Sequence, residues 1–245
     1  MRDPGPDTAD FPDSAFTVAP GVLYVETAVT YQSSKDSPQV RDYSTPTLLR
    51  YGVTDRFELR LSGFFVHEQE ATSRTGVGPL GIGFKRHFWD EQPDRFLPAF
   101  GIIGLVTIPT SSAGFDSGRA EPIVYFNFDY TLTERLEFEW NGGIGAFEGD
   151  NGEMFCQGQL LWTFARTWGR EGNFKTFFHG IALLPGGSEN PADPILGTRN
   201  QEEVVIGPGY VWFRGNRLAW DASYNYGVTG ASPHRLIRFG MSMAF

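Results

Sequence analysis

Apolar and polar residues alternate with a period of two along most of this 245-residue chain. Residues 57–62 read FELRLS and residues 136–141 read LEFEWN, so aliphatic and aromatic side chains fall on one face and mostly charged ones on the other. This period is typical of β-strands. Each stretch directly follows a short Thr-acid-Arg connection, at 54–56 and at 133–135, which predicts a hairpin.

The alternation continues along the chain and predicts twelve long strands. Strands that cross a bilayer in a tilted barrel have about 9–11 residues, whereas strands of globular proteins usually have about 5–6. The length therefore favours an all-β fold that is a single closed antiparallel transmembrane barrel. The predicted strands span residues 22–33, 42–53, 57–68, 79–89, 96–108, 121–132, 136–147, 154–166, 174–184, 202–213, 217–227 and 234–245.

The connections alternate between short turns and longer loops rich in Gly, Pro, Ser and Asp. Short periplasmic turns and longer extracellular loops are typical of outer-membrane barrels. A soluble β-sandwich also has loops at both ends, so this pattern does not decide alone. The short connections are 54–56, 90–95, 133–135, 167–173 and 214–216, and the longer ones are 34–41, 69–78, 109–120, 148–153, 185–199 and 228–233.

Aromatic residues are distributed unevenly between the two ends of the predicted strands. All six tryptophans lie close to a short connection, and several tyrosines lie nearer the long loops. Trp and Tyr favour the boundary between lipid and water, and membrane barrels carry an aromatic girdle at each boundary. We expect a membrane girdle formed by Trp89, Trp140, Trp162, Trp212, Trp220 and Phe245.

The last strand ends the chain on its apolar face. Residues 234–245 read HRLIRFGMSMAF, in which the face that contains Ile237 and Phe239 also contains the terminal Phe245. This ending resembles the C-terminal signature that the barrel-insertion machinery of Gram-negative bacteria recognises. We therefore expect that machinery, outer-membrane lipids and lipopolysaccharide as partners.

Composition limits the other classes of protein. The net charge of −9 argues against nucleic-acid binding, and a single cysteine excludes a disulfide framework or a cysteine-based zinc site. The mean hydropathy of −0.26 fits strands that average two different faces. Residues 1–14, rich in Pro and Asp, lack the features of a signal peptide. We expect them to form a periplasmic tail, with a lumen plug as the alternative, and residues 15–245 to form the barrel.

Several stretches resemble a known family. They are FPDSAFTVAPGVLYVETAVTYQ, TPTLLRYGVTDRFELRLSG, GIGFKRHF, VTIPTSSAGFDSGRAEP and YTLTERLEFEWNGG. In this order they are similar to outer-membrane transporters associated with the meta-pathway of phenol degradation, and the resemblance runs from about residue 9 to 245. It implies an outer-membrane barrel and uptake of aromatic or hydrophobic compounds, and it carries no catalytic motif. His179 departs from the family, because an acidic residue is expected there.

Alternation assigns a large set of polar side chains to the inside of the barrel. They could form a charged constriction along a solute path, where side-chain rings set selectivity. Alternatively, they could pair with one another and fill a narrow lumen, since buried charges must be paired. The lumen-lining candidates are Glu26, Arg50, Glu58, Arg60, Lys85, His87, Glu137, Glu139, Lys175, His179, Glu203, Arg217, Asp221 and Arg238.

Motifs for catalysis or cofactor binding are weak. GVGPLG at 76–81 fits a dinucleotide fingerprint, but a strand rather than a helix follows it. The paired carboxylates of 57–62 and 136–141 lie near a rim and not in a dry pocket. A hydrolase with its active site on the outer wall of the barrel needs a serine beside an outward histidine such as His67. Ser44, on the neighbouring strand, is expected to face inward. No cofactor or metal is expected, and the loop 185–199 is interpreted as a surface loop rather than a gate.

The sequence thus predicts a non-enzymatic channel for passive uptake of small, hydrophobic or aromatic solutes, in a Gram-negative outer membrane with both termini in the periplasm. Two alternatives stay open: a non-conducting structural or assembly-partner barrel, and an outer-membrane hydrolase. Conductance in planar bilayers separates the first two, and a serine-reactive probe tests the third.

Overall fold

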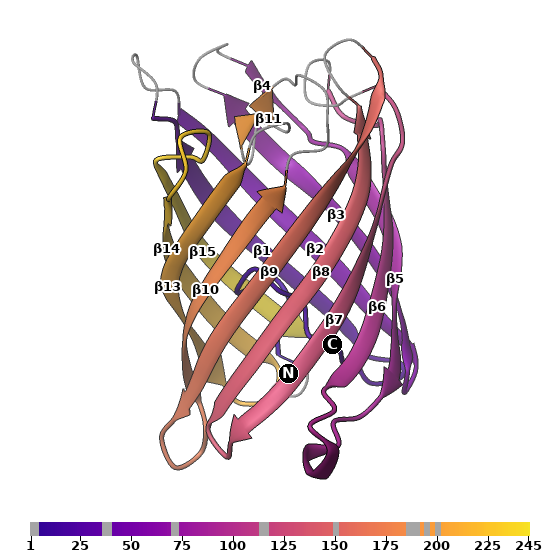
Figure 1. The fold of residues 1–245 in the computed structure, drawn as a ribbon, viewed down its shortest axis with the longest axis vertical. Helices are drawn as coiled ribbons and strands as arrows, with labels where there is room; N and C mark the ends of the chain where they lie inside the picture. The colour runs from indigo at the N-terminus through magenta and orange to yellow at the C-terminus, as the bar shows by residue number, and fades with distance from the viewer. Residues whose placement is uncertain are drawn as a thin grey trace.

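The computed structural model shows a single cylinder of tilted strands (Figure 1). It describes residues 5–35, 41–69, 74–112, 118–148, 152–184, 192–193, 197–198 and 202–245. Thirteen strands share one antiparallel sheet; β4 pairs with the end of β3, and the other twelve form the ring. Within the described residues, no helix has the length and apolar character needed to cross a bilayer.

The ring closes where the first strand meets the last. β1 pairs with β15 over ten residue pairs, from Tyr24–Ala244 to Ser33–Arg235. Every other pair of adjacent strands in the ring is consecutive in the order of the twelve ring strands along the chain. Closure satisfies the backbone groups that an open sheet would expose to lipid. The ring strands are β1 Leu23–Ser33, β2 Arg41–Thr54, β3 Phe57–Gln69, β5 Leu80–Trp89, β6 Ala99–Ile108, β7 Glu121–Thr133, β8 Leu136–Glu148, β9 Met154–Trp168, β10 Phe174–Leu184, β13 Glu203–Arg214, β14 Leu218–Gly227 and β15 Arg235–Ala244.

The twelve predicted strands are therefore confirmed, with boundaries that mostly agree within one or two residues. One boundary was wrong: the strand predicted at 96–108 begins at Ala99. A 3₁₀ turn, η2 (Pro93–Arg95), precedes it, and Phe96 has a left-handed backbone with φ 52° that no strand can continue. The short turns lie at the lower end in Figure 1 and the long connections at the upper end.

The two faces of each strand differ as the period of two requires. On β3, the outward Leu59 is 50% exposed, whereas the inward Glu58 is fully buried. On β9, the outward Phe164 is 45% exposed and the inward Thr163 is fully buried. The cylinder thus presents its apolar residues outward and encloses charged ones, the reverse of a soluble globular fold.

The tryptophans all belong to the outward face. Trp140 lies opposite Trp162 in the β8–β9 register, and Trp212 lies opposite Trp220 in the β13–β14 register. The Trp89 ring packs against Phe100 in a tilted arrangement with centroids 4.5 Å apart, and its indole N–H donates a hydrogen bond to the Pro98 carbonyl. The predicted girdle residues are thus clustered towards the short-turn end of the wall.

Residues 5–20 run inside the barrel, and this corrects the expectation of a tail. Thr8 and Val18 donate backbone hydrogen bonds to the carboxylates of Glu26 and Glu58, which are fully buried on the inner wall. Residues 7–18 of this segment belong to no strand of the sheet. Their backbone groups therefore need other partners, which inward side chains of the strands provide. The described part of residues 1–14 therefore follows the lumen-plug alternative.

Several outward aromatic rings lie over glycines of the next strand. A Cβ atom at Gly180 would come within 2.7 Å of the Trp162 ring, whereas one at Gly158 would meet Leu184 at an ordinary 3.4 Å. We expect Gly180→Ala to cost about 1–3 kcal/mol of unfolding free energy, because overpacking displaces the ring. The change is measured as a lower midpoint for the heat-dependent shift in gel mobility. Gly158→Ala is the matched control, and equal losses in both variants would contradict the packing account.

Candidate functional site

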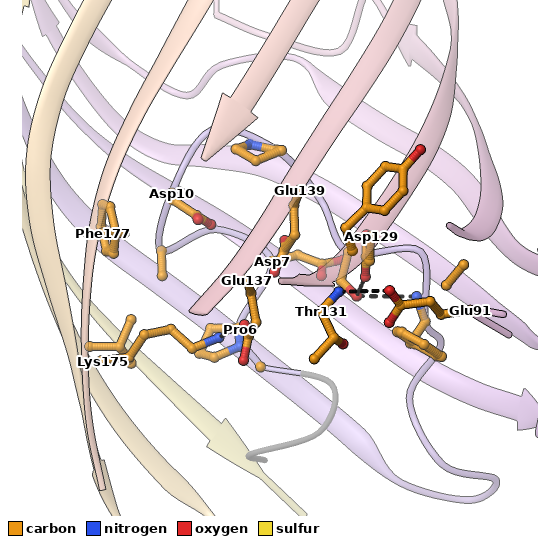
Figure 2. Close-up of a pocket in the computed structure, with 18 of the residues that line it drawn as sticks. Pro6, Asp7, Asp10, Glu91, Asp129, Thr131, Glu137, Glu139, Lys175 and Phe177 are labelled. Atoms are coloured by element: carbon orange, nitrogen blue, oxygen red, sulfur yellow. Dashed lines mark hydrogen bonds and ion pairs between the residues drawn. The ribbon is translucent and has the colours of Figure 1, made fainter. Parts of the chain in front are cut away.

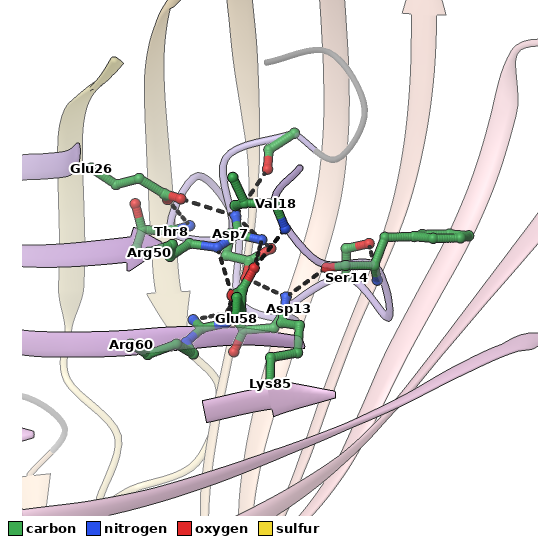
Figure 3. Close-up of polar contacts among 12 residues, drawn as sticks. Asp7, Thr8, Asp13, Ser14, Val18, Glu26, Arg50, Glu58, Arg60 and Lys85 are labelled. Atoms are coloured by element: carbon green, nitrogen blue, oxygen red, sulfur yellow. Dashed lines mark hydrogen bonds and ion pairs between the residues drawn. The ribbon is translucent and has the colours of Figure 1, made fainter. Parts of the chain in front are cut away.

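The N-terminal segment is fastened to the inner wall by a cluster of buried charges, which we call the anchor cluster (Figure 3). Asp7 accepts ion pairs from Arg50 at 3.2 Å, from Arg60 at 2.7 Å and from Lys85. All four side chains are at most 6% exposed. The remaining carboxylates of the cluster are Glu26, Glu58 and Asp13.

Arg50 is the centre of the strand half of this cluster. Its Nε and Nη2 donate to the two Glu58 oxygens at 2.9 and 3.1 Å, and its Nη1 donates to Glu26 at 3.1 Å. This forked geometry is the strong form of a guanidinium–carboxylate pair. Burial alone would raise the pKa of Asp7, but Arg50, Lys85 and Arg60 hold it well below its usual range. Asp7 is therefore ionised over the whole physiological pH range.

Further along the segment, contacts reach the opposite wall. The backbone N–H of Phe11 donates to His179 Nδ1 at 3.0 Å, and the two rings stack with centroids 4.1 Å apart. His179 Nδ1 is thus an acceptor, so its Nε2 carries the proton and donates to Asn225 at 2.6 Å. The neutral imidazole fixes the path of the chain between the two walls.

The segment is also held where it turns towards β7. The carbonyl of Asp13 accepts hydrogen bonds from the amides of Asn127 and Asn141, both at 2.9 Å. The Asp129 carboxylate accepts from the Ser14 hydroxyl at 2.7 Å and from the Ala15 N–H at 3.0 Å. Contacts with strands from β1 to β10, and with Arg238 on β15, therefore hold residues 7–18 across the lumen.

A cavity of about 380 Å³ remains between the segment and the wall, towards the short-turn end (Figure 2). Its lining is rich in acids. Among the described residues that line it, Lys175 is the one basic side chain, and it pairs with Glu137 at 2.7 Å. We call this space the acidic cavity. Its carboxylates are Asp7, Asp10, Glu91, Asp129, Glu137 and Glu139.

Two carboxyl groups of the segment make its attachment sensitive to pH. Burial raises the pKa of Asp10 to about 7, against the effect of Lys175, and raises that of Asp13 to about 6, against Arg60. The attached segment therefore keeps protons that a free segment, with pKa values near 3.8, would release. Attachment is strongest near pH 4, weakens as the pH rises towards 7, and then levels off.

We expect openings of the channel in planar bilayers to become more frequent between about pH 4.5 and 7.5. Asp10→Asn, which cannot ionise, should flatten most of this dependence. Asp7 does not interfere, because its depressed pKa keeps it charged throughout the window. Openings that become rarer as the pH rises would contradict this account.

Another part of the interior is apolar. Residues on β9, β10, β13 and β14 form two buried clusters, one nearer the long-loop end and one nearer the short-turn end. The segment adds Ala9 to one cluster and Phe11 to the other. We call this side the apolar wall. Its strand residues are Leu161, Ile181, Leu183 and Val205 in one cluster, and Ala165, Phe177, Val211, Phe213 and Ala219 in the other.

The structure separates the fourteen predicted interior residues into groups. Arg217 is exposed in the turn between β13 and β14, outside both strands, although the predicted strand 217–227 includes it. Glu203 is buried near the long-loop end, away from the charged residues of the lower lumen. The anchor cluster contains Glu26, Arg50, Glu58, Arg60 and Lys85, and the acidic cavity contains Glu137, Glu139 and Lys175. Separate contacts with the segment, or with residues beside it, are made by His87, His179, Asp221 and Arg238.

Sequence reasoning missed Asp7, Asp13 and Asp129. The first two lie in a stretch without periodicity, which gives no indication that it enters the barrel. A signal existed in the local charge count, because β2, β3 and β5 direct Arg50, Arg60 and Lys85 inward. Glu26 and Glu58 balance two of these three cations, so another acid was required nearby.

The weak motifs acquire no support from the fold. β5 begins at Leu80 within GVGPLG, so a strand occupies the place where a dinucleotide site needs a helix. In the described part of the chain, no group of three His, Cys, Asp or Glu residues is arranged to hold a metal ion. The side chain of His67 and most of the loop 185–199 lie outside the described residues.

A closed antiparallel ring of twelve long strands, apolar outside and charged inside, is a β-barrel of the outer-membrane type. The chain belongs to the family described as "Putative MetA-pathway of phenol degradation", whose model matches residues 6–245. This confirms the resemblance seen in the sequence. Among curated proteins, no sequence matches the chain.

Solved structures share the fold at low sequence identity. The COG4313 outer membrane channel from Pseudomonas putida F1 superposes with a TM-score of 0.70 at 12% identity, over 98% of this chain and 99% of that one. The NanC porin gives 0.59 at 10% identity, over 89% and 98%, and the KdgM porin gives 0.57 at 9%, over 91% and 99%. At these identities the likeness shows the fold.

Proposed function

We propose that the protein is a passive channel for small apolar or aromatic solutes, located in the outer membrane of a Gram-negative bacterium. The observation that carries the proposal is the apolar wall. It consists of one cluster with Leu183 and Val205 near the long-loop end and a second with Phe213 and Ala219 near the short-turn end, with the buried polar side chains of Thr163 and His179 between them. A purely polar filling would suit a structural barrel, whereas two apolar clusters at different heights of the lumen offer favourable contacts to an apolar solute.

The fold family adds support to this proposal. The solved barrels described above include an outer membrane channel and two porins, and the family description refers to phenol degradation. Residues 5–20 cross the lumen in this structure and contact both walls, so we infer that passage requires that segment to move. The short turns and both termini would then face the periplasm, as in barrels of this type.

We also infer that the insertion machinery recognises Phe245. This side chain is 63% exposed on the outer wall. Its backbone N–H donates to the Leu23 carbonyl at 2.9 Å and its carbonyl accepts from the Leu23 N–H at 3.2 Å, so it is the last residue of the closing seam. Deletion of Phe245 should reduce membrane assembly more than it reduces synthesis, as measured by the fraction found in outer-membrane pellets.

The solute class can be tested in liposomes with a variant that lacks residues 2–16. Influx of phenol, an aromatic probe, should exceed influx of a sugar of similar size. Leu161→Asn together with Ile181→Asn should slow phenol influx selectively, because both residues belong to the apolar wall. Equal slowing of both solutes, or no preference in the starting variant, would overturn the proposal.

The many contacts of the segment favour one alternative, a permanently closed barrel with a structural or assembly role. In that case the full-length protein and the variant lacking residues 2–16 would differ in conductance, yet the full-length protein would show no openings under any condition. Labelling by a serine-reactive probe would instead support a hydrolase, and we propose no catalytic role for any residue.

A further inference from the structure

The two Thr-acid-Arg hairpins share a feature that the channel function does not use. In both, the residue after the arginine pairs with an outward arginine on the following strand: Phe57 with Arg86, and Leu136 with Arg166. The turn arginine is joined to the same strand, since the Arg56 carbonyl accepts from His87 N–H at 3.0 Å. The Arg135 carbonyl likewise accepts from the Thr167 N–H at 2.9 Å. Each hairpin therefore places two arginines at neighbouring register positions of adjacent strands at the short-turn rim.

An aromatic ring supports the strand arginine in each case. The Arg166 guanidinium lies 4.3 Å from the centroid of Trp168, and the Arg86 guanidinium lies 5.2 Å from the centroid of Phe88. Trp168 is itself held by a 2.7 Å hydrogen bond from its indole N–H to Thr176. Stacking on an aromatic face orients a guanidinium and leaves its N–H donors free.

These arginines are exposed and lack strong acidic partners. Among the described residues, no ion pair is formed by Arg86, Arg135 or Arg166. Arg56 donates a 3.2 Å hydrogen bond to the Phe88 carbonyl and has one weak ion-pair contact, at 4.0 Å, with the exposed Asp90. Cationic side chains on the lipid-facing wall are costly at the bilayer centre and are tolerated near its surface. At the surface, the available anionic groups are lipid phosphates.

We propose that each hairpin forms a binding site for the phosphate headgroup of an anionic phospholipid in the adjacent leaflet. A guanidinium fork matches phosphate oxygens in two-point contacts, and two arginines lie at neighbouring rim positions in each hairpin. The occupant is a phospholipid rather than a soluble phosphate, because the site lies on the outer wall beside outward aromatic side chains. The proposal rests on the membrane barrel and is independent of conduction.

A third hairpin of the same chain lacks half of this arrangement. Leu218 pairs with Met243, the Arg217 carbonyl accepts from Ala244 N–H at 2.9 Å, and Phe245 follows two residues after Met243. The geometry is the same, but a methionine stands where the other two hairpins have an outward arginine. This hairpin therefore serves as a control, because it has an arginine in the turn but none on the adjacent strand.

The test uses purified full-length protein in micelles, titrated with phosphatidylglycerol or phosphatidylcholine and examined by native mass spectrometry. The wild type should retain phosphatidylglycerol preferentially. Arg135→Gln with Arg166→Gln should weaken binding at one site roughly 30-fold, from the ~1 kcal/mol that each basic residue contributes at an anionic surface. Arg56→Gln with Arg86→Gln should do the same at the other site.

Arg214→Gln with Arg217→Gln, in the third hairpin, removes the same charge and should leave retention unchanged. An equal loss in this control would show that general surface charge, and not the paired sites, binds the lipid. Equal retention of the two lipids by the wild type would also overturn the proposal, as would full competition by millimolar inorganic phosphate. The heat-dependent gel shift verifies that each variant is folded, and conductance, measured separately, reports on the channel function.

Discussion

Removing residues 2–16 is expected to convert a closed barrel into one with steady conductance. These residues include the part of the segment that crosses the lumen and contacts both walls. Without them, the interior of a twelve-stranded barrel has room for water along its length, so conductance in planar bilayers should rise on the order of tenfold or more. An unchanged conductance would show that other parts of the chain close the lumen.

A single substitution should reproduce part of this effect. Asp7 contributes one carboxylate to three cations, Arg50, Arg60 and Lys85. Asp7→Asn keeps the size and removes the charge, so the segment should detach often and the channel should show frequent openings. Asp10→Asn is the matched control in the same segment. Asp10 contacts the acidic cavity and not the three cations, so this variant should remain closed.

The largest effect on stability is expected from Arg50→Met. Arg50 is fully buried, and its removal would leave Asp7, Glu26 and Glu58 together without their shared cation. Loss of one partner of a buried ion pair costs about 3–5 kcal/mol, because the remaining charge is uncompensated. Urea unfolding, followed by the gel-mobility shift, should show a loss of this size.

Two further variants test the cause of this loss. Adding Glu58→Met to Arg50→Met removes one of the uncompensated carboxylates and should restore part of the stability. Arg56→Met changes an arginine that is 60% exposed and makes only a 4.0 Å ion-pair contact and an exposed hydrogen bond to the Phe88 carbonyl, so it should shift the free energy of unfolding by less than about 0.5 kcal/mol. A double variant less stable than Arg50→Met alone would contradict the electrostatic explanation.

Most of the barrel could be predicted from the sequence because a strand between lipid and a polar interior must alternate. Around Glu58 and Glu139, the alternation of apolar and charged residues predicts both the strand and which side chains face the interior. The turn after β5 was less predictable, since Phe96 adopts a left-handed conformation that an aromatic residue rarely takes.

The site was only partly predictable, because its other half comes from a segment without periodicity. Contacts such as Asp13 N–H to Asn141 and Phe11 N–H to His179 are made by backbone groups, which every sequence possesses. Alternation identified the strand side of these contacts for His179 and placed Asn141 on the inner face. It contained no information about what those side chains bind.

Alternate residues of each strand face the hydrocarbon of the bilayer and the interior of the barrel, and the tryptophans test this arrangement directly. All six belong to the outward face near the short-turn end. In liposomes made with brominated acyl chains, tryptophan emission should be strongly quenched, more by bromine near the headgroup than by bromine near the bilayer centre. Emission that is unaffected by brominated lipids and readily quenched by iodide from the aqueous phase would contradict the account.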